Sequence, residues 1–106
     1  MLALAWLILN LLVSSQGIDP CKVYGRVYFE TNRSYADVTV FIQESESFAD
    51  VLVFKQDNAL YADASGLWFI TKDRAMADVL VYKTKKQNQA DFSIFYTDTE
   101  SFAGCN

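Results

Sequence analysis

An aromatic residue followed eight positions later by an alanine occurs six times in this chain, and no other feature constrains the fold as strongly. The repeated aromatic residues are Tyr28, Phe41, Phe54, Phe69, Tyr82 and Phe95. The repeated alanines are Ala36, Ala49, Ala62, Ala77, Ala90 and Ala103. Successive alanines are 13 residues apart except at one central step of 15, which divides the repeats into three and three. Such a repeat defines a scaffold, whereas activity depends on the residues that the scaffold carries.

The residues that follow each alanine predict β-strands. Runs rich in β-branched and aromatic residues cover residues 38–42, 51–55, 79–83 and 92–96, and such runs favour extended structure. The polar stretches between them have no helical periodicity of useful length, so we expect turns or single helical turns there. The sequence therefore predicts an all-β fold of six short strands.

The repeat length predicts how these strands are arranged. A unit of 13 residues is too short for a propeller blade or for a full rung of most β-helices, so each unit is expected to form one side of a polygon. Three units would complete one lap, and the two-residue insertion around residues 64–66 would mark the start of the second lap. Repeat one would then lie beside repeat four, two beside five and three beside six. The repeated aromatic side chains would point inward and form the core in stacked layers. The small alanines would lie where one segment of the chain passes closely over another.

Three stretches of the sequence resemble a known family. They are the cadence of residues 27–41, the central Gly66-Leu-Trp-Phe69 and the closing Ser101-Phe-Ala-Gly-Cys105. They are similar to short proteins of unknown function, some of which form a sevenfold torus knot, the septoil knot. The resemblance covers residues 22–104 and implies a deeply knotted β architecture of two laps, although true knots are almost absent from proteins. It assigns no functional residue, and this chain departs from the family pattern in its apolar start, its terminal cysteines and Gln89.

The first 17 residues have the pattern of a secretory signal peptide. Residues 1–13 are apolar apart from Asn10, and the small polar stretch that follows offers cleavage after Ser15 or after Gly17. As a helix, this apolar run spans about 20 Å, less than the roughly 30 Å of a bilayer's hydrocarbon core. We predict a signal peptide at residues 1–17, a single β-repeat domain at residues 18–106 and a secreted protein. The alternatives are an uncleaved anchor and a buried first helix.

The two cysteines, Cys21 and Cys105, lie at opposite ends of the predicted domain. A cysteine pair in a small secreted domain predicts a disulfide. On the chain-entropy model, a disulfide that closes so long a loop adds about 4 to 5 kcal/mol to the free energy of unfolding. The predicted domain is near the size below which disulfides are commonly needed for stability. The alternative is two free or buried thiols in a cytosolic protein.

An aspartate follows the alanine in five of the six repeats, and Gly104 follows it in the last. These aspartates are Asp37, Asp50, Asp63, Asp78 and Asp91. We expect each carboxylate to accept hydrogen bonds from backbone N–H groups of the turn that it begins, as in Asx-turns and helix caps. The alternative is a ring of carboxylates that binds Ca²⁺.

Composition excludes several classes of function. The chain has 13 acidic and 9 basic residues and a net charge of −4, which disfavours nucleic acid and anionic membranes as partners. The one basic cluster, residues 83–86, is interpreted as a solvated turn. The absence of histidine removes the commonest general base and the commonest zinc ligand, so we expect no enzyme, no cofactor and no metal. The alternative is a small hydrolase that uses acids such as Glu44, Glu46 and Asp57.

These observations predict a secreted, non-enzymatic binding or stability module. An alternative is a secreted effector that binds an extracellular protein or a glycan, because Arg33, Tyr61 and Arg74 occupy equivalent turns of a rigid scaffold. Asn32 begins the sequon Asn-Arg-Ser, so it is a candidate N-glycosylation site in a predicted surface loop. The alternative for Asn32 is an ordinary polar turn.

Processing is directly testable. We expect the protein recovered from culture medium to lack its first 15 to 17 residues and to be two protons lighter than its reduced form, because a disulfide removes two thiol hydrogens. Intact-mass spectrometry before and after reduction measures both. A full-length cytosolic species with two alkylatable thiols would contradict the prediction.

Overall fold

The computed structural model describes residues 18–106, so the predicted signal peptide at residues 1–17 lies outside the described residues. The strands are β1 (Gly25–Phe29), β2 (Val38–Ile42), β3 (Val51–Lys55), β4 (Leu67–Ile70), β5 (Val79–Thr84), β6 (Phe92–Tyr96) and β7 (Gly104–Cys105). The 3-10 helices are η1 (Pro20–Lys22), η2 (Arg33–Tyr35), η3 (Glu46–Phe48), η4 (Ala59–Tyr61), η5 (Arg74–Met76), η6 (Gln87–Gln89) and η7 (Glu100–Phe102). The all-β prediction is confirmed, and the polar stretches form single helical turns. None of the helices in residues 18–106 is long and apolar enough to cross a membrane.

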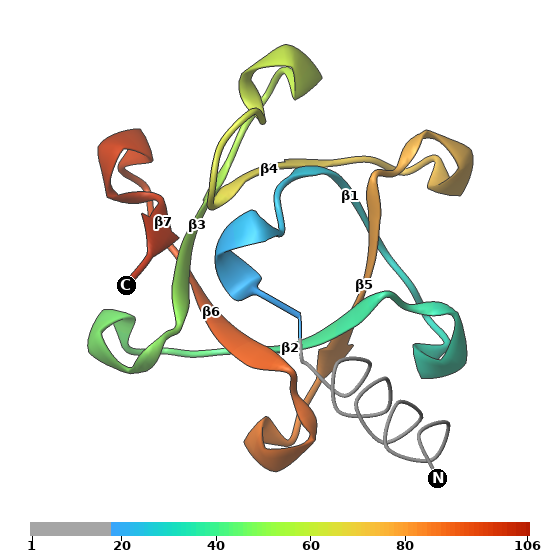
Figure 1. The fold of residues 1–106 in the computed structure, drawn as a ribbon, viewed down its shortest axis with the longest axis horizontal. Helices are drawn as coiled ribbons and strands as arrows, with labels where there is room; N and C mark the ends of the chain where they lie inside the picture. Colours follow the sequence, from blue (N-terminus) through green and yellow to red (C-terminus); the bar gives the residue numbers. More distant parts are fainter. Residues whose placement is uncertain (1–17) are drawn as a thin grey trace, which may run out of the picture.

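The strands form a closed ring in which the two laps alternate. The order is β4-β1-β5-β2-β6-β3, and β3 also pairs with β4 to close the ring. All pairings within the ring are parallel. Every first-lap strand therefore lies between two second-lap strands. Figure 1 shows the resulting star, with the helices η2 to η7 at the ends of the arms and η1 at the centre of the ring. The predicted neighbours, repeats one and four, two and five, and three and six, are confirmed.

The ring closes along the edge of β3 that faces away from β6. Both β7 and β4 pair with this edge, at different residues. Leu52 pairs with Gly104 of the antiparallel β7, whereas Phe54 pairs with Leu67 of β4. Gly66, in the inserted segment, has a φ of +78°, and a Cβ atom there would overlap the Gly104 backbone nitrogen and the Leu52 carbonyl oxygen. The insertion therefore marks the start of the second lap, as predicted, and a residue without a side chain is required at this crossing.

The barrel interior is filled by the residue that precedes each repeated aromatic. These residues, each with 0% exposure, are Val27, Val40, Val53, Trp68, Val81 and Ile94. The prediction that the aromatics form the core is wrong: Tyr28, Phe41, Phe54, Phe69, Tyr82 and Phe95 are only half-buried, and none belongs to the core cluster. Side chains alternate along a strand, so only one of two neighbours can point inward. A ring of six strands is too narrow for six aromatic side chains, and it holds one large ring, Trp68, among five smaller side chains.

The two ends of the barrel are closed differently. At the end where the strands begin, the indole N–H of Trp68 donates to the Val23 carbonyl oxygen (2.9 Å), which holds the N-terminal segment over the core. At the end where the strands finish, Phe29 and Tyr96 pack against the core. The ammonium groups of Lys83 and Lys55 lie 4.4 and 4.0 Å from the centres of these two rings. Burial raises the pKa of the Tyr96 phenol, so this ring remains neutral beneath its lysine.

The predicted disulfide is present. Cys21 of η1 and Cys105 of β7 are bonded across 84 residues of sequence, with Cα atoms 5.4 Å apart. Because the strands of the second lap are threaded between those of the first, the chain is knotted, and the bond joins the two ends of the knotted segment. The knot therefore cannot be untied while the disulfide is intact.

Refolding should depend on whether the knot is retained. We expect oxidised protein, denatured in guanidinium and then diluted, to regain its native fluorescence markedly faster than protein that was reduced and denatured long enough to untie. The untied chain must pass an end through a loop again, whereas the oxidised chain is still threaded. Stopped-flow and manual-mixing refolding measure the two rates. Equal rates would contradict a threaded topology.

Candidate functional site

Four of the repeat aspartates join the two laps of the ring through reciprocal hydrogen bonds. The Asp37 N–H donates to the Leu80 carbonyl oxygen (2.7 Å), and the Leu80 N–H donates back to Asp37 Oδ2 (2.8 Å). The same arrangement joins Asp50 to Ser93, Asp78 to Arg26 and Asp91 to Thr39. Each pair connects residues 43 or 52 positions apart. The expectation that these carboxylates bond the turn that they begin is therefore wrong, because each one binds a strand of the other lap.

Asp63 differs from the other four aspartates. It makes no such bond with any residue of the described chain, residues 18–106. The preceding alanine explains the difference: Ala62 has a ψ of 60°, whereas Ala36 has a ψ of 145° and Ala49 of 144°. The backbone leaves this repeat in another direction to enter the two-residue insertion, so the Asp63 carboxylate does not reach a neighbouring strand.

Other side chains cap the 3-10 helices. Asn32 Oδ1 accepts from the Ser34 N–H, Asn58 Oδ1 from the Leu60 N–H and Asp73 Oδ1 from the Ala75 N–H, each at 3.0 Å. Asp19 caps η1 in the same way. Sequence reasoning missed this role, although an Asn or Asp just before a polar turn is its usual signal. Asn32 is exposed, which leaves the glycosylation prediction open.

Within residues 18–106 the predicted acidic residues do not come together as a metal-binding group. The repeat aspartates lie on separate arms, and four of them use Oδ2 for the inter-lap bonds. Across residues 18–106 no three His, Cys, Asp or Glu side chains are grouped as metal ligands. Of the acids considered for hydrolysis, Glu46 belongs to η3 whereas Asp57 precedes η4 on another arm.

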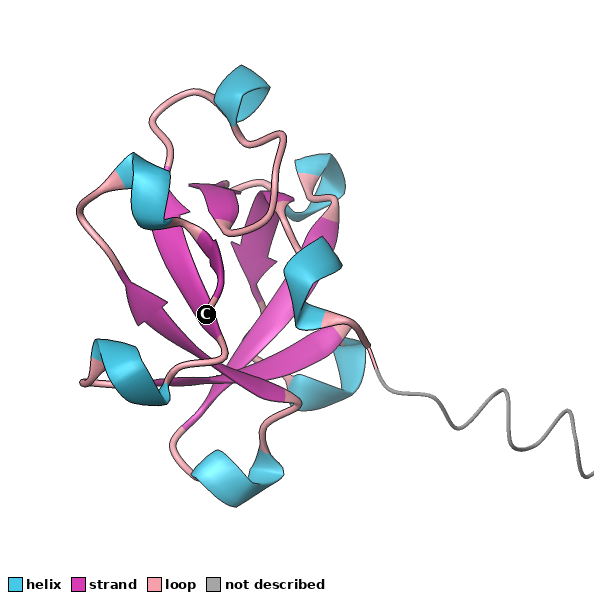
Figure 2. Cartoon of the chain, turned by 60° about the vertical axis from the view of Figure 1, so that its left-hand side comes forward, coloured by secondary structure: helices cyan, strands magenta, loops and turns pink. Residues whose placement is uncertain are grey.

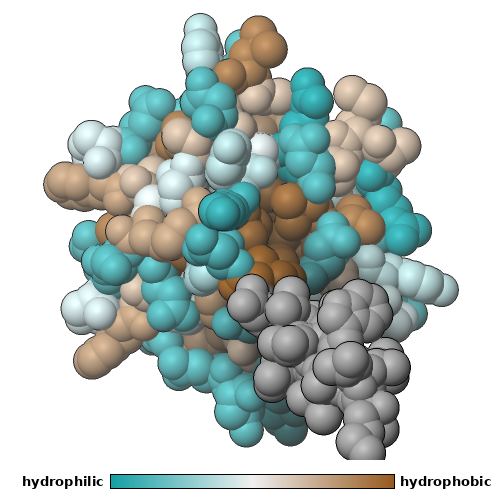
Figure 3. Space-filling model, in the orientation of Figure 1, coloured by the Kyte–Doolittle hydropathy of each residue, from teal (hydrophilic) through white to brown (hydrophobic). Residues whose placement is uncertain are grey.

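The arms carry exposed apolar side chains at an equivalent position. In each of the helices η2 to η7, the last residue precedes the repeated alanine and points away from the barrel. Its exposed fraction is 58% for Tyr35, 73% for Phe48, 61% for Tyr61, 53% for Met76 and 58% for Phe102, and the sixth position is the polar Gln89. The helices surround the strands in Figure 2. In Figure 3 hydrophobic side chains reach the outline of the molecule, for example at the top, where η4 lies in Figure 1.

Three neighbouring arms, η5, η2 and η6, are braced by arginine. The Arg74 guanidinium lies 5.2 Å from the centre of the Tyr35 ring, and its Nε is 2.6 Å from Oε2 of Glu30, whose side chain is only 6% exposed. Arg33 Nη2 donates to the Gln89 carbonyl oxygen (2.8 Å). Arg74 and Arg33 therefore connect neighbouring arms on this side of the ring, and Arg74 covers part of the exposed Tyr35 ring.

The other three arms, η3, η7 and η4, form a surface that is both apolar and acidic. It carries Phe48, Phe102, Tyr61 and Leu60, the last with 75% exposure. The segments 45–50, 57–63 and 98–103 contain six acidic residues and no Lys or Arg. These acidic residues are Glu46, Asp50, Asp57, Asp63, Asp98 and Glu100. The three arms are adjacent in Figure 1, from lower left to top. We call this surface, made of η3, η7 and η4 with these segments, the acidic rim.

Comparison with protein families agrees with this topology. A family model described as a 7(1) septoil knot domain matches residues 20–106. The chain belongs to the septoil knot family. No curated protein matches the chain. Because the match covers nearly all of the described residues, the interlaced ring is the septoil knot itself.

The inter-lap aspartates of the septoil knot can be tested against a matched control. We expect Asp50→Ala to lower the free energy of unfolding by about 1 to 3 kcal/mol, because the buried Ser93 N–H loses its acceptor. Asp63→Ala removes the same carboxylate without such a bond, and it should change stability by less than about 0.5 kcal/mol. Equilibrium guanidinium unfolding of the oxidised proteins measures both. Equal losses of unfolding free energy in the two variants would show that the carboxylates affect stability only through the net charge of the domain.

Proposed function

We propose that this septoil knot domain is a secreted, non-catalytic binding module that uses the acidic rim to bind a basic surface of another extracellular protein. The observation that carries the proposal is the exposure of Phe48, Leu60, Tyr61 and Phe102 on adjacent arms that contain six acidic residues and no basic one. Large apolar side chains left in water on neighbouring arms are typical of an interaction surface.

The chemistry of the rim supports a protein partner. Aromatic residues supply most of the binding energy of protein interfaces when a partner buries them. Acidic residues around them attract a basic partner and increase its rate of association. The same acids disfavour nucleic acid and anionic lipid, which are themselves negative.

The scaffold supports the same proposal. The reciprocal bonds between Asp50 and Ser93 hold the base of η3, and the hydrogen bond from Gln56 Nε2 to Glu100 Oε1 (2.7 Å) connects the end of β3 to η7. At η3, the Asn106 side-chain amide donates to the carbonyl oxygens of Glu46 (2.9 Å) and Ala49 (3.1 Å). A surface held in this way loses little conformational entropy on binding.

Secretion is supported by two observations. The Cys21–Cys105 disulfide is of the kind that forms in oxidising compartments, and the apolar residues 1–13 precede the domain with a small polar stretch after them.

The test is a screen of purified extracellular proteins for binding to the oxidised domain. The affinity of any partner found is then measured for variants of the acidic rim. We expect a basic partner whose affinity falls about tenfold to thirtyfold with Phe48→Ser or Phe102→Ser, as for interface hot spots, and whose association rate falls as salt is added. Surface-plasmon resonance measures affinity and rate.

Met76→Ser is the matched control, because Met76 occupies the equivalent position on a braced arm. It should leave affinity unchanged, and none of the three exposed substitutions should change stability by more than about 0.5 kcal/mol. A partner that is insensitive to Phe48 and Phe102, or equally sensitive to Met76, would contradict the proposal, as would the absence of any basic partner.

A further inference from the structure

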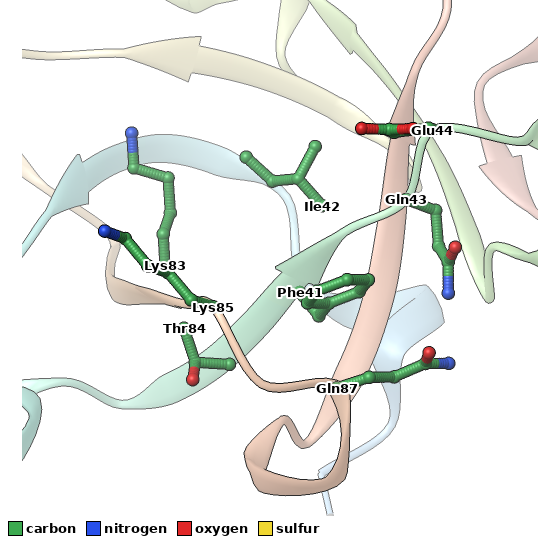
Figure 4. A pocket seen from close by; sticks show the side chains of 8 residues that line it. All are labelled: Phe41, Ile42, Gln43, Glu44, Lys83, Thr84, Lys85 and Gln87. Carbon is green, nitrogen blue, oxygen red and sulfur yellow. The ribbon is translucent and has the colours of Figure 1, made fainter.

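An open hollow of about 670 Å³ lies where β2 and β5 separate. The two strands pair up to Phe41 and Thr84; beyond this point β2 continues toward Gln43, whereas β5 turns away into η6. The space between the diverging segments is lined by side chains from both (Figure 4). This hollow is separate from the helices of the acidic rim, and the proposed function does not use it.

Side chains of different chemical character line different parts of the hollow. In Figure 4 Lys83 and Lys85 lie at one end, the Phe41 ring lies in the middle, and Gln43 and Gln87 lie at the other end. The lining therefore offers, in sequence, positive charge, an aromatic ring and two amides that can both donate and accept hydrogen bonds.

The positive end is available to a ligand. Within residues 18–106 neither the Lys83 nor the Lys85 ammonium makes an ion pair with a carboxylate. Lys83 rests over the Phe29 ring, with its nitrogen 4.4 Å from the ring centre, a contact that does not neutralise its charge. The lining has one acid, Glu44, which Figure 4 shows on the side away from the lysines. The basic cluster, interpreted from the sequence as a solvated turn, is thus one wall of a hollow.

We propose that this hollow binds an acidic saccharide, an oligosaccharide that contains uronic acid. A sugar ring has an apolar face of C–H groups, which packs on the face of an aromatic ring such as Phe41. Its hydroxyl groups match the amides of Gln43 and Gln87 and the carboxylate of Glu44. Its carboxylate is placed by the two lysines.

A simple anion does not account for the whole lining. It would use only the lysines and would leave Phe41 and the two amides without a role. A neutral sugar, conversely, would leave two uncompensated lysines at one end. An acidic sugar is the ligand class that can contact the lysines, the Phe41 ring and the two amides of the hollow together.

The experiment is a calorimetric titration of the oxidised domain with trigalacturonic acid and, separately, with its methyl ester, which keeps the rings and removes the charges. We expect the acid to bind and the ester to bind at least about tenfold more weakly. Lys85→Gln should weaken binding of the acid about twofold to fivefold, as expected for one exposed charge pair. Phe41→Leu should weaken it further, because an aliphatic side chain offers no ring face.

Two controls use the repeat itself. Lys72 lies 13 residues before Lys85, and Phe54 lies 13 residues after Phe41, so Lys72→Gln and Phe54→Leu make the same changes at equivalent positions outside the hollow. Both should leave binding unchanged. Equal binding of acid and ester, competition by inorganic sulfate at the same concentration as the saccharide, equal effects of the paired variants, or no binding at millimolar saccharide would each overturn the proposal.

Discussion

The two-way hydrogen bond between an aspartate of one lap and a strand residue of the other is the interaction on which the arrangement of this domain depends. In the pair of Asp50 and Ser93, the aspartate supplies both an N–H donor and a carboxylate acceptor, so the partner residue has its N–H and its carbonyl satisfied together. Ser93 is buried, and a buried backbone group without a partner is costly. The bond therefore holds the laps in register at the point where an arm joins the ring.

This arrangement explains how a small domain can carry long, exposed arms. The core is one layer of β-branched residues around Trp68, supported by Val38, Val51 and Phe92, and by itself it is modest for a domain of this size. Closure of the ring leaves no long free edge, and the Cys21–Cys105 bond joins its two ends. Because these features stabilise the ring, the helices at the arm ends are free to expose residues such as Phe48 that a less constrained domain would bury.

Exposure on the arms is not symmetric, and the asymmetry gives the domain distinct surfaces. Arg74 and Arg33 tie η5, η2 and η6 together, whereas the arms of the acidic rim present their aromatic residues without a covering arginine. The lysines of residues 83–86 lie at yet another place, beside the hollow between β2 and β5. A repeat with one scaffold thus carries two different surfaces with aromatic side chains, one flanked by acidic residues and the other by lysines.

The repeat pattern alone predicts the local structure and the winding of the chain. The 13-residue period, the β-branched runs and the insertion at Gly66 predict the strands, the division into two laps and the pairing of repeat one with repeat four, because all of these follow from periodicity and chain length. Tertiary structure decided which neighbour in each strand faces inward. Val27 faces inward rather than Tyr28, but Trp68 does so rather than Phe69, because the closed ring has room for one large side chain among smaller ones. It also decided the partners of the aspartates, since Asp37 and Leu80 are brought together by the alternation of laps. Finally, it decided that Phe48 is exposed whereas Trp68 is buried, because a helix of three residues at the end of an arm has no layer above it to cover its last side chain.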